Sequence, residues 1–190
     1  MSILPTLDKV FTILLPQQCL LCGAHSGDAP LCGACTAALP MRSTTRCPVC
    51  ALPTPGGMVC GACLKSPPAF DASHAVWRYA FPVDKLVQAL KFSQRLPLAR
   101  SFAAVLHIPL DFDTCRRARE TLPQSSLPWK ERRRNIKNAF ECRGDLSGKS
   151  VIVVDDVMTT GATLDEFART LKRHGAVSVP DWVVARALKD

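Results

Sequence analysis

Residues 151–163 read VIVVDDVMTTGAT and join a hydrophobic run, two acidic residues and a short loop of small residues. The four branched residues Val151–Val154 predict a strand that is buried on both faces, as in a parallel sheet. We expect this strand to end where Asp155 and Asp156 begin. Apolar residues then continue at helical spacing, at positions 164, 167, 168 and 171. The stretch therefore predicts a strand, a tight loop and the N-terminus of a helix.

This arrangement suits an anionic ligand, because the backbone N–H groups of a helix N-terminus point toward it. The loop adds three threonine hydroxyl donors, and Gly161 allows the chain to approach a ligand closely. The carboxylates of Asp155 and Asp156 would repel a phosphate, so we expect them to face ribose hydroxyls or a hydrated metal ion. A phosphate beside a diol describes a ribose 5-phosphate.

The stretch resembles the signature of type I phosphoribosyltransferases that binds 5-phosphoribosyl diphosphate (PRPP), and it fits that pattern at every position. The resemblance implies that Asp155 and Asp156 hold the ribose 2- and 3-hydroxyls, with Mg2+ bridging the pyrophosphate. It also implies that one loop wraps the 5-phosphate, formed by Thr159, Thr160, Gly161, Ala162 and Thr163.

Four Cys-x-x-Cys pairs lie in the N-terminal third of the chain, and the tetrapeptide Cys-Gly-Ala-Cys occurs at 32–35 and again at 60–63. Each cysteine of the first two pairs recurs 28 residues later. Two such pairs complete a tetrahedral four-cysteine zinc site, so we expect about two structural zinc ions. The predicted ligands are Cys19, Cys22, Cys32 and Cys35, followed by Cys47, Cys50, Cys60 and Cys63.

Sequential pairing within each repeat is the arrangement we expect, and a crossed arrangement stays open. Disulfides would need an oxidising compartment that nothing in the sequence indicates. A thioredoxin-like redox role usually involves one Cys-x-x-Cys pair rather than four in register. Cys115 and Cys142 stand apart from the pairs, and we expect both to be ordinary semi-buried thiols.

The remaining pattern predicts an α/β fold in two parts. An N-terminal helix over 1–18 and a double zinc ribbon region occupy residues 1–66, and Ser66-Pro67-Pro68 marks the boundary. A shortened phosphoribosyltransferase-like domain follows at 67–190, with a strand over 74–81 and a helix from Val83 to Phe92. A last strand spans 177–185, and because Pro180 interrupts it, a start after Pro180 stays open. We expect a reduced, mainly parallel sheet flanked by helices.

A block of strong positive charge precedes the acidic stretch. Residues 115–143 contain nine Lys or Arg against three Glu, which is +6 of the formal net charge of +8. The run Arg132, Arg133, Arg134 lies inside it. Such a block can contact pyrophosphate, a base-bearing substrate or single-stranded DNA, and a solvated helix face is its simplest alternative.

The cysteine pairs, the segment Asp-Lys-Leu-Val-Gln-Ala-Leu-Lys-Phe at 84–92 and the basic block together resemble the ComF/GntX family. That family joins a zinc ribbon to a phosphoribosyltransferase-like domain and includes factors for natural transformation and DNA utilisation. The resemblance implies PRPP as ligand, and single-stranded DNA and DNA-uptake proteins as partners.

One part of the family pattern is missing. Relatives carry a strand of the Val-Pro-Val-Pro-Leu kind and an Arg-x-Arg-Gly-Phe-Asn-Gln-like segment, whereas this chain passes from Arg100 straight into Ser101. An internal deletion of some tens of residues would explain the join. The missing strand should lie beside Val151–Val154, so we expect an exposed sheet edge that could support an oligomer, and impaired catalysis.

No apolar run reaches the roughly 18 residues that cross a membrane, and no secretion signal is evident, so we expect a cytoplasmic protein without membrane insertion. Three functions stay open. The protein is a PRPP-binding phosphoribosyltransferase with doubtful activity, a single-stranded DNA-binding adaptor, or an inert remnant.

Overall fold

The computed structural model describes residues 18–27, 29–40, 45–92, 107–119 and 136–188. The expected N-terminal helix over 1–18 lies outside these ranges apart from its last residue. The join between Arg100 and Ser101 and the run Arg132–Arg134 also lie outside them.

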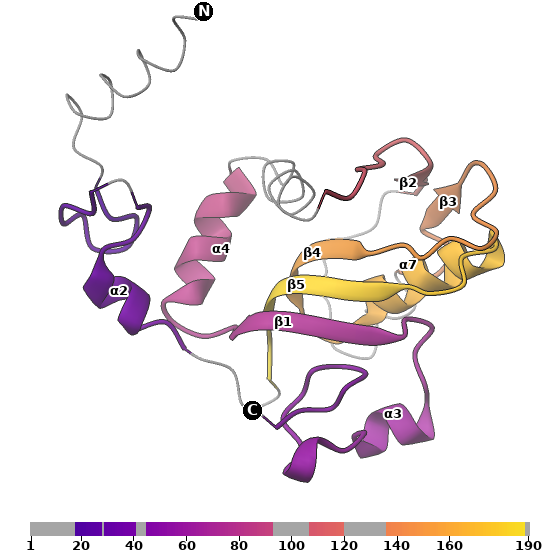
Figure 1. The fold of residues 1–190 in the computed structure, drawn as a ribbon, viewed down its shortest axis with the longest axis horizontal. Coiled ribbons are helices and arrows are strands. Elements are labelled where there is room, and N and C mark those ends of the chain that lie inside the picture. The colour runs from indigo at the N-terminus through magenta and orange to yellow at the C-terminus, as the bar shows by residue number, and fades with distance from the viewer. Residues whose placement is uncertain (1–17, 28, 41–44, 93–106, 120–135, 189–190) are drawn as a thin grey trace, which may run out of the picture.

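A parallel sheet of three strands forms the centre of the described residues (Figure 1). The strands are β1 (Ala72–Arg78), β4 (Val153–Met158) and β5 (Pro180–Arg186), in the order β1-β5-β4. In the register, Ala72 is opposite Pro180 and Val153 is opposite Asp181. The α/β class and the parallel sheet agree with the sequence prediction.

In the described part of the chain, helices α7 and α4 pack on opposite faces of this sheet. Helix α7 (Ala162–Arg173) connects β4 to β5 and packs Leu164, Ala168 and Leu171 against buried residues of the strands. Helix α4 (Val83–Phe92) packs Val83 and Val87 into a second cluster that contains Val184. The bounds predicted for α4 are confirmed.

The predicted bounds of the acidic strand were wrong. β4 begins at Val153 and continues to Met158, so both acidic residues lie inside the strand instead of after it. The reason is its pairing with β5, which reaches as far as Met158 opposite Arg186. Val153 is buried whereas Val151, Ile152 and Val154 are half-buried, because β4 is an edge of the described sheet.

Two other strands also differ slightly from the prediction. β1 begins and ends earlier than 74–81, and β5 begins at Pro180 itself, between the two starts that the sequence left open, and ends at Arg186. A proline has no N–H to donate, so it is tolerated as the first residue of a strand.

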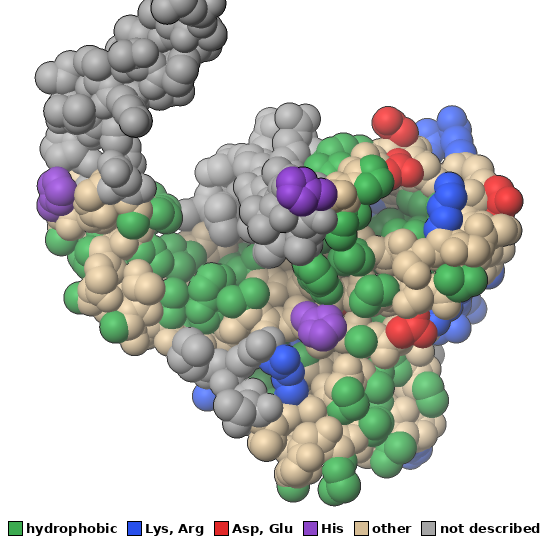
Figure 2. Space-filling model, viewed as in Figure 1, with side chains coloured by type: hydrophobic (Ala, Val, Ile, Leu, Met, Phe, Trp, Pro, Cys, Tyr) green, Lys and Arg blue, Asp and Glu red, His purple; other side chains and the backbone are tan. Residues whose placement is uncertain are grey.

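A separate antiparallel pair joins β2 (Cys115–Arg117) to β3 (Phe140–Cys142). Cys115 and Cys142 are opposite each other in this pair and form a disulfide. The prediction of two separate thiols was therefore wrong, since 27 residues of sequence separation gave no sign that they would meet. Figure 2 shows that charged side chains of both signs gather at the end of the molecule that carries β2 and β3.

The two zinc ribbons repeat the same local structure 28 residues apart. A bridge between Gln18 and His25 closes the first turn, and a bridge between Arg46 and Pro53 closes the second. A one-turn helix carries the last cysteine of each ribbon, α2 (Gly33–Ala37) and α3 (Gly61–Lys65), and a 3-10 turn at Pro55–Gly57 precedes α3. In Figure 1, α2 lies beside α4 and α3 lies on the other side of the sheet.

In the part of the chain that the structure describes, no helix is both long enough and apolar enough to cross a membrane.

Candidate functional site

The loop between β4 and α7 has the geometry of an anion site at a helix N-terminus. Gly161 is the N-cap of α7 and has φ +79°, a conformation that favours glycine. A Cβ atom at Gly161 would lie 2.8 Å from the Cε atom of Met158. The N–H of Ala162 donates to the Thr160 hydroxyl at 3.0 Å, and the N–H of Asp165 donates to the carbonyl oxygen of Gly161 at 2.8 Å.

The acidic pair lies on β4 just before this loop. Asp155 and Asp156 are both half-buried, and each carboxylate accepts a hydrogen bond from the following backbone N–H, at 2.9 and 2.7 Å. Consecutive strand residues point to opposite faces of a sheet. In agreement with this, Asp155 adds to the effect of burial in raising the pKa of Asp181, on the face covered by α7. Burial, Asp84 and Asp156 raise the pKa of Tyr79, beside α4.

A fully buried carboxyl group lies close to the acidic pair. Asp181 on β5 has no exposed surface, and the Ser73 hydroxyl donates to its Oδ2 atom at 3.4 Å. Burial raises the pKa of Asp181 to about 8, and the neighbouring carboxylates of Asp155, Asp71 and Asp165 act in the same direction. Asp181 therefore holds a proton at neutral pH.

The part of the basic block that follows the run Arg132–Arg134 packs against the start of α7. Ile136 and Ala139 are buried and form a small cluster with Ala162. The N–H of Asn138 donates to the Glu166 carboxylate at 3.0 Å. Arg134 precedes Ile136 by two residues in sequence but lies outside the described residues.

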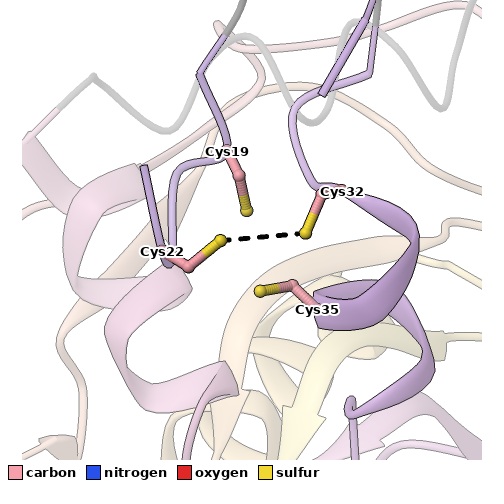
Figure 3. Close-up of side chains that lie close together, drawn as sticks. All are labelled: Cys19, Cys22, Cys32 and Cys35. Atoms are coloured by element: carbon pink, nitrogen blue, oxygen red, sulfur yellow. Dashed lines mark hydrogen bonds between the residues drawn. The ribbon is translucent and has the colours of Figure 1, made fainter. Parts of the chain in front are cut away.

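The eight paired cysteines form two clusters, and in each the four sulfur atoms lie within 4.8 Å of one another. Figure 3 shows the four side chains of the first cluster pointing toward a common centre. The Sγ–Sγ distance is 3.7 Å between Cys22 and Cys32 and 3.6 Å between Cys50 and Cys60. Tetrahedral zinc with bonds of about 2.3 Å requires sulfur atoms about 3.8 Å apart, so both clusters fit the ion. The sequential pairing is confirmed.

Thiols this close cannot all ionise without a cation. The N–H of Cys32 is the largest cause that lowers the pKa of Cys19, to about 6. The hydrogen bond that the Cys35 thiol donates to Cys22 is the largest cause that raises the pKa of Cys35, to about 12. In the second cluster, burial raises the pKa of Cys63, whereas backbone N–H groups outweigh burial and bring Cys47 to about 7. A divalent ion that binds four thiolates must therefore displace protons.

The two clusters differ in their surroundings. Cys22 in the first cluster is exposed, and the neighbouring residues Leu31 and Leu39 pack toward α4. In the second cluster Cys47, Cys50 and Cys63 are buried in the same hydrophobic core as β4 and α7. The second ribbon is thus part of the core that carries the loop.

A cavity of about 570 Å3 lies between the second ribbon and the loop. The ribbon contributes Cys50, Leu52 and Cys63, and Phe70 lies in the same wall. The opposite wall consists of residues 158–162 and Arg186. Asp155 and Asp156 do not line this cavity, so it adjoins the loop without being the place where both acidic side chains converge.

The structure brings together residues that the sequence analysis missed. Arg186 at the end of β5 is 5% exposed and donates from Nε to the carbonyl oxygen of Cys50 at 2.8 Å. Burial lowers the pKa of its guanidinium, and the neighbouring Cys50 opposes that shift. A buried strand that ends in arginine was a visible signal for Arg186, whereas nothing in the sequence marked Asp181.

Sequence comparisons identify both parts of the chain. Residues 10–64 match the family described as double zinc ribbon domain, and residues 95–188 match the family described as phosphoribosyl transferase domain. These matches agree with the expected order of the two parts.

Curated relatives extend over nearly the whole chain. DNA utilization protein YhgH of Escherichia coli O157:H7 is 30% identical over 227 residues, which cover 93% of this chain and 100% of the relative. The protein of that name in Salmonella typhimurium is 30% identical over 230 residues, with the same coverage. Competence protein F of Haemophilus influenzae is 26% identical over 179 residues, 67% of this chain and 78% of the relative.

The lengths in the first comparison also bear on the missing segment. Since 93% of 190 residues is about 177, the 227 aligned positions include about 50 at which this chain has no residue. This agrees with an internal gap of some tens of residues.

Proposed function

Because this chain belongs to the family of the YhgH and competence F proteins, and joins a double zinc ribbon to a phosphoribosyl transferase domain, we propose that it binds PRPP or a related ribose 5-phosphate. The 5-phosphate would occupy the loop formed by Thr159, Thr160, Gly161, Ala162 and Thr163. The acidic pair on β4 would bind the sugar hydroxyls. One observation carries the proposal. The acidic pair near the end of β4 is followed directly along the chain by a glycine N-cap and by the buried N-terminus of α7.

The loop suits a phosphate for two reasons. Its backbone N–H groups and threonine hydroxyls are donors held in place by the fold, and little fixed negative charge is directed at the ligand. The nearest acidic residues of α7 are engaged elsewhere: Asp165 accepts from the N–H of Ala69 at 2.7 Å and pairs with Arg169 at 3.0 Å. Glu166 accepts from Asn138. The positive end of the helix dipole is therefore available to an anion.

The position of β4 at the edge of the described sheet makes a ligand contact with both acids feasible. Side chains of consecutive strand residues point to opposite faces, but a sugar that lies along the open edge can reach both. Mg2+ bound to the pyrophosphate prefers oxygen ligands such as these carboxylates, and it would neutralise phosphate charge. The carboxylates would then accept hydrogen bonds from the diol or from water on the ion.

We propose that transfer of the phosphoribosyl group is weak or absent. A leaving pyrophosphate needs donors where charge develops, and losing one such donor typically lowers the rate by about 100- to 1000-fold. We infer from the family resemblance that those donors belong to the strand and loop whose motifs are missing from this sequence.

Single-stranded DNA binding is the second candidate. It is favoured by the names of the relatives, which refer to DNA utilization and competence, and by the +6 charge of residues 115–143. In this function the basic residues would contact the DNA backbone, and affinity would fall steeply as salt rises.

Calorimetric titration with PRPP, with and without Mg2+, tests the first proposal. Asp155→Asn combined with Asp156→Asn should weaken binding by about 2–4 kcal/mol, because charged hydrogen bonds to the diol are lost. A control variant, Asp113→Asn with Glu141→Gln, removes the same charge from exposed positions and should bind normally.

Unchanged binding in the acidic-pair variant would show that the acids are not the sugar site. If the parent protein binds an oligonucleotide with a steep salt dependence and does not bind PRPP, the second candidate replaces the first.

A further inference from the structure

Arg186 joins the second zinc ribbon to the start of the phosphate loop. Its Nε atom donates to the carbonyl oxygen of Cys50 at 2.8 Å, and its Nη1 atom donates to the carbonyl oxygen of Met158 at 2.8 Å. Nη1 also donates to the carbonyl oxygen of Thr159. Cys50 is a predicted zinc ligand, Met158 ends β4, and Thr159 begins the loop. One planar side chain therefore fixes these three backbone positions relative to one another.

The burial of this charge needs compensation. A guanidinium removed from water is costly unless it is hydrogen-bonded and balanced by negative charge. Carbonyl oxygens of Cys50, Met158, Thr159 and Ala187 satisfy donors of Arg186. Four thiolates around a divalent ion leave a net negative charge, so the loaded second cluster supplies the missing counter-charge.

Packing connects the same elements. Cys47, Cys50 and Cys63 share a hydrophobic core with Phe70, Met158 and Leu164. A Cβ atom placed at Gly161 would meet both Met158 and Phe70, so the loop is held tightly against this core. A shift of the second ribbon would therefore displace the residues on which the loop rests.

The first ribbon offers an internal comparison. It has the same cysteine spacing and the same sulfur geometry, but its neighbours Leu31 and Leu39 pack toward α4 instead. Arg186 donates to the carbonyl oxygen of Cys50 in the second ribbon, whereas the residues around the first cluster belong to the separate hydrophobic cluster at α4. The chain thus contains two chemically alike metal sites, of which the second is fastened to the loop.

We propose that zinc in the second site and a phosphate ligand on the loop are thermodynamically coupled through Arg186, and that the first site is not coupled. Loss of zinc from Cys47, Cys50, Cys60 and Cys63 loosens the loop, and a ligand on the loop slows zinc release from that site. The ligand half of this proposal rests on the proposed ribose phosphate binding. The structural half concerns the loop alone. Arg186 is a positioning residue in this scheme.

Hydrogen–deuterium exchange of the zinc-loaded protein tests the structural half without any ligand. Arg186→Met should increase exchange of amides 159–164 by about tenfold, within the usual range of coupling between sites. Arg78→Met is the matched control, since Arg78 is opposite Arg186 in the register, ends β1 and is exposed. It should leave the loop unchanged. Equal exchange in the two variants would overturn the proposal.

A second measurement avoids the risk that Arg186→Met fails to fold. Cys22→Ser with Cys35→Ser leaves only the second site, and Cys50→Ser with Cys63→Ser leaves only the first. A chelator should strip zinc from the second-site-only protein and raise exchange of the loop amides in step with metal loss. If these amides stay protected until the whole chain unfolds, the coupling does not exist.

Zinc release with and without PRPP tests the reciprocal effect, because coupling between two binding sites must act in both directions. In the wild-type protein, PRPP should slow the release of one of two zinc ions by about tenfold and leave the other unchanged. If PRPP binds and both ions leave at unchanged rates, the ligand half fails. If PRPP does not bind at all, the proposed function fails, and the exchange experiments still decide the structural half.

Discussion

Replacing Asp181 with Asn should change how the stability of this protein depends on pH. Asp181 is fully buried on β5, and its folded-state pKa is about 8, against an ordinary value of 3.8. Below about pH 4 both the folded and the unfolded chain hold this proton. Between the two pKa values the unfolded chain releases the proton and the folded chain keeps it. The free energy of unfolding therefore falls as pH rises through this window.

The size of the effect follows from the shift. One bound proton of difference corresponds to about 1.4 kcal/mol per pH unit, so wild-type protein should lose about 3 kcal/mol between pH 5 and pH 7 from this group alone. Asn carries no proton to release and can still accept the hydrogen bond from Ser73. The difference in unfolding free energy between wild type and Asp181→Asn should therefore shift by about 2–3 kcal/mol in favour of the variant over this range.

Urea unfolding at pH 5, 6 and 7, followed by tryptophan fluorescence, measures this difference directly. Zinc content is measured at each pH for both proteins. Metal loss that is equal in the two proteins cancels in the difference between their unfolding free energies. Asp145→Asn serves as the control. Hydrogen bonds from the hydroxyl and the N–H of Ser147 lower the pKa of Asp145, so its contribution to the pH dependence lies below the window. A wild-type to Asp181→Asn difference that stays constant within about 0.5 kcal/mol would refute the buried, protonated state.

Further predictions concern the metal, the loop and the basic run. Purified protein should contain about two zinc ions by elemental analysis, and acidification should release them because protons compete for the thiolates; four disulfides in place of zinc would contradict this. Gly161→Ala should destabilise the protein more than Gly148→Ala in thermal unfolding. Both positions have positive φ, which costs a residue with a Cβ atom about 1–2 kcal/mol. Of the two, only Gly161 has neighbouring atoms that an added Cβ would contact. Equal losses of stability in the two variants would contradict the argument from close contact. Replacing Arg132, Arg133 and Arg134 with alanine should make oligonucleotide affinity depend less steeply on salt concentration if the protein binds DNA. If the protein does not bind DNA, the same variant should change only the PRPP titrations. No change in either assay would indicate a solvated face.

The zinc ribbons and the acidic stretch could be predicted from sequence because both are local. A Cys-x-x-Cys turn brings two sulfur atoms together within four residues, and the 28-residue repeat favoured sequential pairing while a crossed arrangement stayed open. The strand, loop and helix at 151–173 are contiguous, so hydrophobic periodicity and one glycine were enough to outline them. The exact strand limits were not, since they depend on how far β5 extends alongside β4.

Contacts between distant residues followed from the packed structure. Arg186 meets Cys50 across 136 residues of sequence, and Cys115 meets Cys142 only because β2 and β3 pair. Asp181 reads as an ordinary acidic residue until the sheet order β1-β5-β4 places its strand in the centre and removes it from water. Sequence patterns record the geometry of neighbours along the chain. The burial of a charge and the partner of a side chain depend on which elements pack together, and that is fixed by the tertiary fold.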